Sequence, residues 1–255
     1  MKKTVALLTD FGNKDGFVGA VKAVITSINP DVNIIDISHE VEPFNILEAS
    51  LILNAVYKYF PKGTIFLSVV DPGVGTERRA VIVETEDYIF VSPDNGLLTL
   101  PLKYQTVKKV VHIRNSKYFL PTRTNTFHGR DIFAPVCGYI SLSEPLENFG
   151  EPVYEYVKLP DFDPIYTEDK IIGKIVKFDR FGNAITNIDK LPDRFKVVFR
   201  GYEIERVCTN FLEGEKDRPN LVMGSFGFYE LFIPQGSLKD ILSLQVSEPV
   251  EVYRI

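Results

Sequence analysis

The feature that most constrains the fold is an alternation of apolar runs with helix-patterned stretches in the first hundred residues. The runs at 4–11, 32–38 and 64–71 are almost continuously apolar, whereas 16–28 and 46–60 place apolar residues at helical spacing. Strands buried on both faces have such apolar runs, and intervening helices connect them in parallel. The N-terminal part is therefore predicted to be an α/β domain whose mostly parallel sheet is covered by helices.

The pattern changes near residues 159–169, where prolines and aspartates alternate with aromatic residues. Beyond this segment come short strand-like runs with turns at close spacing and hardly any helical period. These runs lie at 170–179, 184–189, 195–200, 204–208, 220–233 and 249–255. We expect an N-terminal α/β domain over 1–160 and a small antiparallel β-barrel or sandwich over 169–255.

Charge and composition exclude several classes of function. The net charge of -5, with basic residues scattered along the chain, disfavours a nucleic-acid partner. No apolar stretch approaches the length of a membrane span, and the N-terminal run VALL is too short for a signal peptide. Two distant cysteines, Cys137 and Cys208, suggest neither a zinc site nor a disulfide framework. We expect a cytoplasmic protein with no nucleic-acid or membrane partner.

Polar side chains follow two of the predicted strands. Asp10 comes after the first strand, and Asp71 opens a glycine-rich bend that leads to Arg78 and Arg79. Ligands of open α/β sheets bind beyond the carboxyl ends of the strands, where such loops converge. A carboxylate in the position of Asp10 can accept hydrogen bonds from two ribose hydroxyls, although it can equally cap a turn.

A third polar segment, 126–131, places His128 between an aromatic residue and a glycine. A lone histidine is more often structural than catalytic, and His39 competes for the same role. Together with Asp71 and Arg78, however, His128 could orient a water molecule and control its deprotonation. His128 and Asp131 alone are a weak metal signal, so we expect no metal site.

Two further motifs are rich in residues that favour turns. For 92–96 a purely structural role is the better interpretation. The motif at 178–183, which is echoed at 224–227, combines an acid, an amide and phenylalanines. Such groups can bind an amine, pair with an adenine edge and stack on a base, although hairpin turns use the same residues.

Taken in order, these motifs resemble the S-adenosyl-L-methionine hydroxide adenosyltransferases, relatives of the fluorinase and chlorinase enzymes. The seven motifs are TDFGNKDGF, DISHEVEPFN, VVDPGVGTERR, SPDNGLLT, TFHGRDIFAP, FDRFGNAITNI and GSFGFYELFIPQGSL, and they extend over nearly the whole chain. The resemblance implies a Rossmann-like N-terminal domain, a C-terminal β-barrel, and a homotrimer with its sites between subunits. It also implies hydrolysis of S-adenosylmethionine to adenosine and methionine.

The resemblance also implies roles for individual residues. Asp71, Arg78 and His128 match the set around the nucleophilic water, and Asp10 matches the residue that binds the ribose hydroxyls. The other matched positions are Phe44 beside the ligand, Phe181 and Asn183 around adenine, and Asp179 and Ser225 at the methionine end. Two positions depart from fluorinase: Phe226 replaces an arginine and Ile185 replaces a tryptophan.

The expected chemistry is in-line attack of water on the ribose C5′. Phe44, Phe127 and Phe181 would line a poorly solvating pocket, which favours a transition state that disperses the sulfonium charge. Either Asp71 or His128 could be the general base. No cofactor is expected, because S-adenosylmethionine is itself the substrate. Two alternatives remain: a halogenase acting on the same substrate, and a nucleoside-binding protein without turnover.

Overall fold

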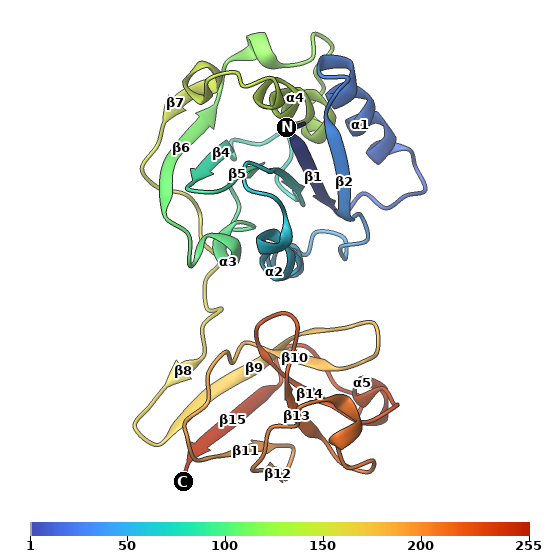
Figure 1. The fold of residues 1–255 in the computed structure, drawn as a ribbon, viewed down its shortest axis with the longest axis vertical. Helices are drawn as coiled ribbons and strands as arrows, with labels where there is room; N and C mark the ends of the chain where they lie inside the picture. Colours follow the sequence, from blue (N-terminus) through green and yellow to red (C-terminus); the bar gives the residue numbers. More distant parts are fainter. Residues whose placement is uncertain (1) are drawn as a thin grey trace. The chain divides into compact units, whose positions relative to one another are not determined.

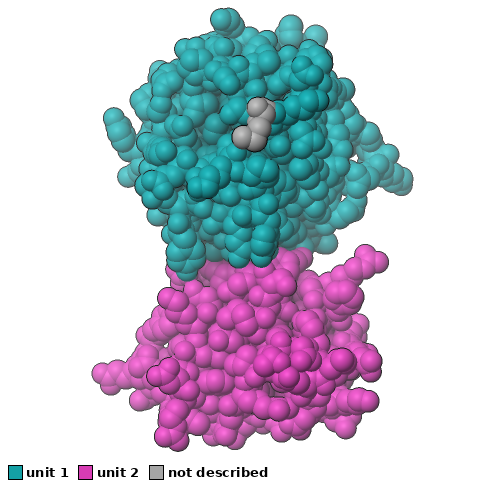
Figure 2. Space-filling view, in the orientation of Figure 1, with its two compact units in different colours: residues 1–159 teal, residues 160–255 magenta. Residues whose placement is uncertain are grey.

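The computed structural model describes residues 2–255, which form two compact units (Figure 2). The first unit ends at Leu159 and the second spans Pro160–Ile255. Within the described residues, no helix is long and apolar enough to cross a membrane.

The first unit is built on a seven-stranded sheet with the order β2-β1-β3-β5-β4-β6-β7. The strands are β1 (Thr4–Thr9), β2 (Asn33–Ser38), β3 (Ile65–Val69), β4 (Ala80–Thr85), β5 (Ile89–Pro93), β6 (Val107–Ile113) and β7 (Gly150–Pro152). The helices are α1 (Phe17–Ile28), α2 (Ile46–Val56), α3 (Thr99–Leu102) and α4 (Ala134–Ser141). Shorter helical turns are η1 (Tyr57–Tyr59), η2 (Ser116–Tyr118), the π-helical η3 (Gly129–Phe133) and η4 (Leu146–Phe149).

The sheet has a parallel half and an antiparallel half. β1 pairs in parallel with β2 and β3, and β3 pairs in parallel with β5. β4 lies antiparallel between β5 and β6, and β7 is antiparallel to β6. Only residues 86–88 join β4 to β5, which is too short for a crossover, so these strands form a hairpin. The predicted α/β class is confirmed, and the sheet is mixed.

Helices cover both faces of this sheet, with α1 and α4 on one side and α2 and α3 on the other (Figure 1). Neighbouring β1 residues point to opposite faces: Leu7 belongs to the core beneath α1 and α4, and Leu8 to the core beneath α2. Both leucines are completely buried. Because every β1 residue from Val5 to Thr9 is buried, β1 reads as a continuous apolar run rather than an alternating one.

The second unit is an antiparallel, nearly closed β-barrel, as predicted. Its sheet has the order β12-β11-β15-β9-β10-β14-β13, with β8 paired to β9. The strands are β8 (Ile165–Tyr166), β9 (Lys170–Phe178), β10 (Ala184–Thr186), β11 (Phe195–Phe199), β12 (Tyr202–Ile204), β13 (Asn220–Met223), β14 (Tyr229–Phe232) and β15 (Pro249–Arg254). Two short helices, η5 (Phe211–Glu213) and α5 (Leu238–Ile241), complete the unit.

One expected strand is shorter than its apolar pattern indicates. The run at 204–208 contributes only its first residue to β12, and the rest leaves the strand. A single bridge then joins Cys208 to Val222 of β13. This bridge lies at the seam between the two edge strands of the barrel, so the sheet is almost closed without a continuous ladder there.

Candidate active site

Parallel pairing brings the first two predicted acids together. Thr9 of β1 pairs with Val69 of β3, so Asp10 and Asp71 follow neighbouring strands at the same edge of the sheet. Both carboxylates line a hollow of about 550 Å³ in the first unit. Three other predicted residues, Phe44, Phe127 and His128, line the same hollow. The sequence-based grouping of these strand-end motifs is therefore present in the structure.

Arg78 does not line the hollow but clamps two residues that do. Its Nε lies 2.9 Å from Asp71 Oδ1, and its Nη2 also donates to Asp71 Oδ2. The same Nη2 lies 2.9 Å from Nδ1 of His128. The guanidinium also stacks over the Phe133 ring, 5.3 Å from its centroid. Because a planar guanidinium donates in fixed directions, Arg78 sets the positions of Asp71 and His128 relative to each other.

This contact determines the protonation of His128. Arginine has only donors, so His128 Nδ1 accepts, and the neutral ring carries its proton on Nε2. Burial lowers the pKa of His128, and the nearby charge of Arg78 lowers it further. His128 therefore presents a neutral Nε2–H donor, which is suited to hold an oxygen atom.

Loop contacts hold His128 in place. A Cβ at residue 75 would overlap the backbone carbonyl of Asn125, so the absence of a side chain at Gly75 lets the 71–79 loop pack against the histidine loop. Asp131 is completely buried and accepts hydrogen bonds from the backbone N–H and hydroxyl of Thr124 and from Arg130. Asp131 thus has a structural role in the loop. Within residues 2–255 no group of three potential metal ligands is present.

Asp10 supports the opposite wall of the hollow. Its Oδ2 accepts a hydrogen bond of 2.9 Å from the backbone N–H of Phe44. Burial raises the pKa of Asp10, with a smaller contribution from the charge of Asp71, whereas the Phe44 N–H opposes the rise. Phe44 itself is 69% exposed and has φ of 67°, a left-handed conformation that is unusual for a bulky residue. Such strain is typical of functional loops.

Aromatic rings form the apolar side of the hollow. Phe127 makes edge-to-face contacts with Phe11 and Phe17, at centroid distances of 5.5 Å and 5.2 Å. Phe11 and Phe17 are not among the site residues predicted from the sequence, although both belong to the TDFGNKDGF motif. Their spacing does not follow a strand or helix period. They could be predicted as site residues only if the whole motif were interpreted as part of a ligand site.

Several other polar residues lie outside this site. His39 is buried, with its Nδ1 2.8 Å from Thr9 Oγ1 and its Nε2 3.0 Å from an Asp36 oxygen. Arg79 is paired with Asp94 of the 92–96 turn, whose other oxygen accepts from the Val157 N–H. These contacts are structural, in agreement with the interpretation of 92–96 as a turn.

The second unit contains the remaining predicted residues, and a tight turn organises three of them. Asp179 Oδ1 accepts from the backbone N–H groups of Phe181 and Asn183, and its Oδ2 accepts from the Asn183 side-chain amide at 2.8 Å. Phe181 is 74% exposed, whereas Asn183 is buried. Both line a hollow of about 600 Å³ together with Phe211 and Gln235. One N–H of the Asn183 side-chain amide is bound to Asp179, so its carbonyl oxygen and its second N–H are left for a ligand.

Ser225 lies in the exposed turn between β13 and β14, and it does not line this hollow. The turn is closed by hydrogen bonds from the N–H of Gly224 to Phe228 and from the N–H of Gly227 to Gly224. Phe226 is half-buried in the same turn, and Ile185 is completely buried on β10.

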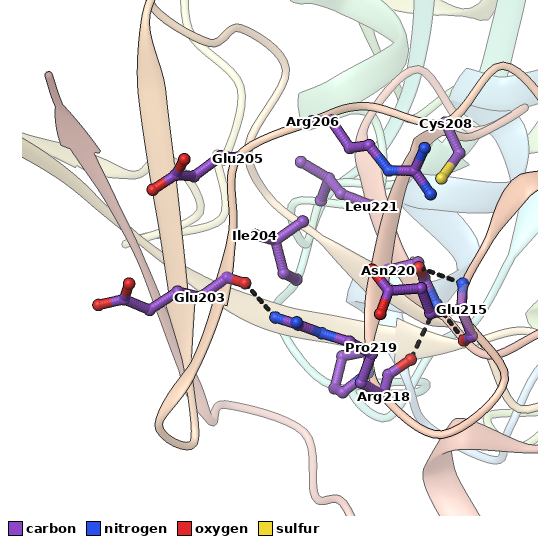
Figure 3. Close-up of a pocket in the computed structure, with 10 residues that line it drawn as sticks. All are labelled: Glu203, Ile204, Glu205, Arg206, Cys208, Glu215, Arg218, Pro219, Asn220 and Leu221. Atoms are coloured by element: carbon purple, nitrogen blue, oxygen red, sulfur yellow. Dashed lines mark hydrogen bonds between the residues drawn. The ribbon is translucent and has the colours of Figure 1, made fainter.

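A third hollow, of about 430 Å³, lies at the barrel seam and contains none of the predicted site residues (Figure 3). Its lining is a mixture of acidic and basic side chains from the segments around β12 and β13. Arg218 donates to the backbone carbonyl of Glu203, and Asn220 bonds to the backbone of Glu215 and Arg218. The lining residues therefore bind one another, as is typical of a charged surface at the edge of a barrel.

Comparisons with known proteins agree with this arrangement. Two proteins named (R)-S-adenosyl-L-methionine hydrolase are similar over nearly their full lengths. The one from Thermus thermophilus is 34% identical, covering 98% of this chain and 99% of the relative. The one from Methanocaldococcus jannaschii is 33% identical, covering 97% and 95%. A crystal structure of a protein from Thermotoga maritima matches with a TM-score of 0.88 at 37% identity, covering 98% of this chain and all of that one.

Models of the two domains of one family match successive parts of the chain. Residues 5–150 match the SAM hydroxide adenosyltransferase N-terminal domain, and residues 173–251 match the C-terminal domain. The matched ranges include the Asp10 and Asp71 strand ends in the first unit and the Asp179 turn in the second. The chain therefore belongs to the SAM hydroxide adenosyltransferase family.

Proposed function

We propose that this protein hydrolyses S-adenosyl-L-methionine to adenosine and L-methionine. The observation that carries the proposal is that Asp10, Asp71 and His128 line one hollow, and that Arg78 links Asp71 to His128 from behind, in a chain from this family. This set offers two groups that can hold one water molecule, and a cation that fixes both of them. The proposed substrate needs little else, because its sulfonium is already a good leaving group.

In the proposed step, the oxygen of a water molecule forms a bond to C5′ while the C5′–S bond breaks. The sulfonium becomes the neutral thioether of methionine, and the attacking oxygen loses a proton to become the 5′-hydroxyl of adenosine. The charge of the reactants is dispersed along this path, so a poorly solvating pocket lowers the barrier. Phe11, Phe17 and Phe127 provide such walls. Positioning supplies most of the remaining rate enhancement.

The two candidate bases have different roles in this proposal. His128 Nε2–H donates to the water oxygen, since its Nδ1 is bound to Arg78. Asp71 accepts a hydrogen from the water and receives the proton as the C–O bond forms. A carboxylate can take this proton, because an oxygen that is bonding to carbon becomes strongly acidic. Arg78 is the positioning residue for both groups.

Binding of the nucleoside is assigned to groups in both units. Asp10 accepts from the ribose hydroxyls with the oxygen that Phe44 does not use. Phe44 and Phe181, both exposed, offer faces for the ligand, and Asn183 offers its carbonyl oxygen to the amino group of adenine. Asp179 and Ser225 are assigned to the methionine end. We further propose that the (R) configuration at sulfur is preferred, as in the names of the two relatives.

The test is product analysis with each resolved sulfonium epimer, in excess chloride. Hydrolysis predicts equal amounts of adenosine and methionine, released faster from the (R) epimer. A 5′-chloro-5′-deoxyadenosine product would instead identify a halogenase. If a single-turnover reaction yields no nucleoside product while the ligand remains bound, the protein is a binding module. Equal rates for the two epimers would refute the stereochemical part alone.

We also propose a homotrimer in which each site combines residues of two subunits. The test uses Asp71→Asn and Asp179→Ala variants, each inactive by itself. Co-refolded mixtures should regain part of the activity, because some sites then receive both intact faces. Sedimentation verifies the trimer, and a mixed trimer as inactive as its parents would place the whole site within one chain.

A further inference from the structure

His39 is a buried histidine that the proposed mechanism does not use. The residue is only 4% exposed and does not line the hollow. Its Nδ1 lies 2.8 Å from the Thr9 hydroxyl oxygen, and its Nε2 lies 3.0 Å from Asp36 Oδ1. Because both ring nitrogens face polar partners, the orientation of the buried imidazole is fixed. The ring is therefore a rigid group close to the site.

His39 lies where the backbone pairing of β1 and β2 stops. The parallel ladder ends at the pair of Leu8 and Ser38, directly after a register shift. Beyond this pair the strands continue into the loops 10–16 and 39–45. The contact between Thr9 and His39 is the next connection after the ladder, and both residues are buried. The side chain of His39 thus joins the two strands where their backbones no longer pair.

Further hydrogen bonds extend this connection to both neighbours of Asp10 in the chain. The Thr9 hydroxyl accepts from the backbone N–H of Phe11 at 3.3 Å. The N–H of Gly12 donates to the backbone carbonyl of His39 at 2.8 Å. Asp10 lies between Thr9 and Phe11, so the residues that His39 holds flank this carboxylate directly.

The same two loops also meet at the ligand side. Asp10 Oδ2 accepts from the N–H of Phe44, and Asn13 donates to Glu40 in an exposed contact. Water competes for the exposed contact, whereas the contact of Thr9 with His39 is shielded from it. A carboxylate that accepts two hydroxyls must be placed accurately, and buried supporting contacts provide this. We infer that His39 is a positioning residue that holds Asp10 in place for the ribose hydroxyls. The inference rests on the proposed function, in which Asp10 binds the ribose.

Two substitutions separate the two sides of the imidazole. In His39→Asn the amide stands where Nδ1 stands, and it can bond to the Thr9 hydroxyl as a donor or as an acceptor. In His39→Gln the amide reaches instead toward Asp36, and the Thr9 hydroxyl loses its partner. Both substitutions remove the ring, so a difference between the two variants reports the Thr9 contact.

The test compares adenosine with 2′,3′-dideoxyadenosine, which lacks both ribose hydroxyls. Wild type should bind adenosine more tightly. His39→Gln should lower the affinity for adenosine about tenfold and leave the affinity for the dideoxynucleoside unchanged, whereas His39→Asn should bind both nucleosides as wild type does. His112→Gln, at a half-buried histidine of β6 outside the hollow, is the matched control and should also bind both normally. Equal losses for the two nucleosides, or equal losses in His39→Gln and His39→Asn, would overturn the inference.

Two further measurements separate positioning from a general effect on the fold. In the ligand-free protein, amide hydrogen exchange of 10–17 and 39–46 should be faster in His39→Gln than in His39→Asn, while thermal melts of the two variants agree. In an Asp10→Asn background, His39→Gln should cause little further loss of adenosine affinity, because His39 acts through Asp10. Additive losses, or equal exchange rates in the two variants, would contradict the positioning role.

The outcomes also separate this inference from the proposed function. Nucleoside binding involves no turnover, so the result does not depend on hydrolysis. If wild type forms adenosine from S-adenosyl-L-methionine and His39→Gln keeps the preference for adenosine over the dideoxynucleoside, only the His39 inference is overturned. If the preference is lost as expected but wild type forms no adenosine, the hydrolase proposal fails and the His39 inference stands.

Discussion

The polar clusters of the two units differ in how their charges are balanced. In the first unit, Arg78 joins Asp71 and His128, so the cluster is neutralised by its own members before any ligand binds. In the second unit, Glu230 is buried beside Asp179 without a cation. A self-paired cluster is rigid and suited to orient a neutral water. An acid pair without a cation instead makes the stability of the fold depend on pH, because one carboxyl is held in its protonated form.

The largest expected effect comes from breaking the self-paired cluster. Arg78→Lys keeps the charge but cannot donate to Asp71 and His128 in the same fixed geometry, so turnover should fall about a hundredfold or more. Adenosine affinity should change little, because Arg78 does not line the hollow. Steady-state rates and adenosine titrations measure both quantities.

Arg79→Lys is the matched control, because Arg79 is the next residue in the chain and pairs with Asp94 outside the hollow. Its turnover should stay within a few-fold of wild type. Asp71→Asn and Arg78→Lys combined should cost little more than the worse single variant, because the two residues act as a unit. Full activity of Arg78→Lys would show that turnover does not depend on Arg78 positioning Asp71 and His128.

The second expected effect is on the free energy of unfolding, through the buried carboxyl of Glu230. The pKa of Glu230 is about 7 in the fold, against 4.5 for an ordinary glutamate, so the folded state binds this proton more tightly than the unfolded state. The free energy of unfolding should therefore fall as pH rises from about 4.5 to 7, by about 3 kcal/mol in total from this group. Glu230→Gln should remove this loss.

Urea unfolding of wild type and Glu230→Gln at pH 5 and pH 8 measures that difference. The comparison between the two proteins cancels acids such as Asp131, whose lowered pKa gives the opposite pH dependence. If both proteins show the same pH dependence, Glu230 is already ionised or paired in the fold. The contrast between the two clusters would then disappear.

A smaller effect is expected at Asp10, which serves binding in the first unit. Asp10→Asn should lower the affinity for adenosine and the affinity for S-adenosyl-L-homocysteine by a similar factor, about tenfold or more, because both ligands contain the ribose. Isothermal titration measures the affinity for each ligand. If only one of the two affinities falls, Asp10 does not bind the ribose hydroxyls.

Much of this arrangement could be predicted from the sequence, because local patterns determine it. Buried strands and helix periods predict the α/β unit, and the acids just beyond the ends of β1 and β3 have to meet at one sheet edge. The position of Arg78 behind Asp71 depends on how the 71–79 loop packs against Asn125, a long-range contact that no local pattern encodes. Likewise, Glu230 reads as an ordinary polar residue of a strand, and only the register with β10 and β13 reveals its neighbours.

The most direct test of the account is a single turnover of S-adenosyl-L-methionine in ¹⁸O-labelled water with excess chloride. Attack of the oriented water on C5′ predicts one ¹⁸O atom in the 5′-hydroxyl of adenosine and none in methionine. The rate should collapse in Asp71→Asn while S-adenosyl-L-homocysteine still binds. Unlabelled adenosine, a chlorinated nucleoside, or a wild-type rate in Asp71→Asn would contradict the central claim that this cluster delivers the water.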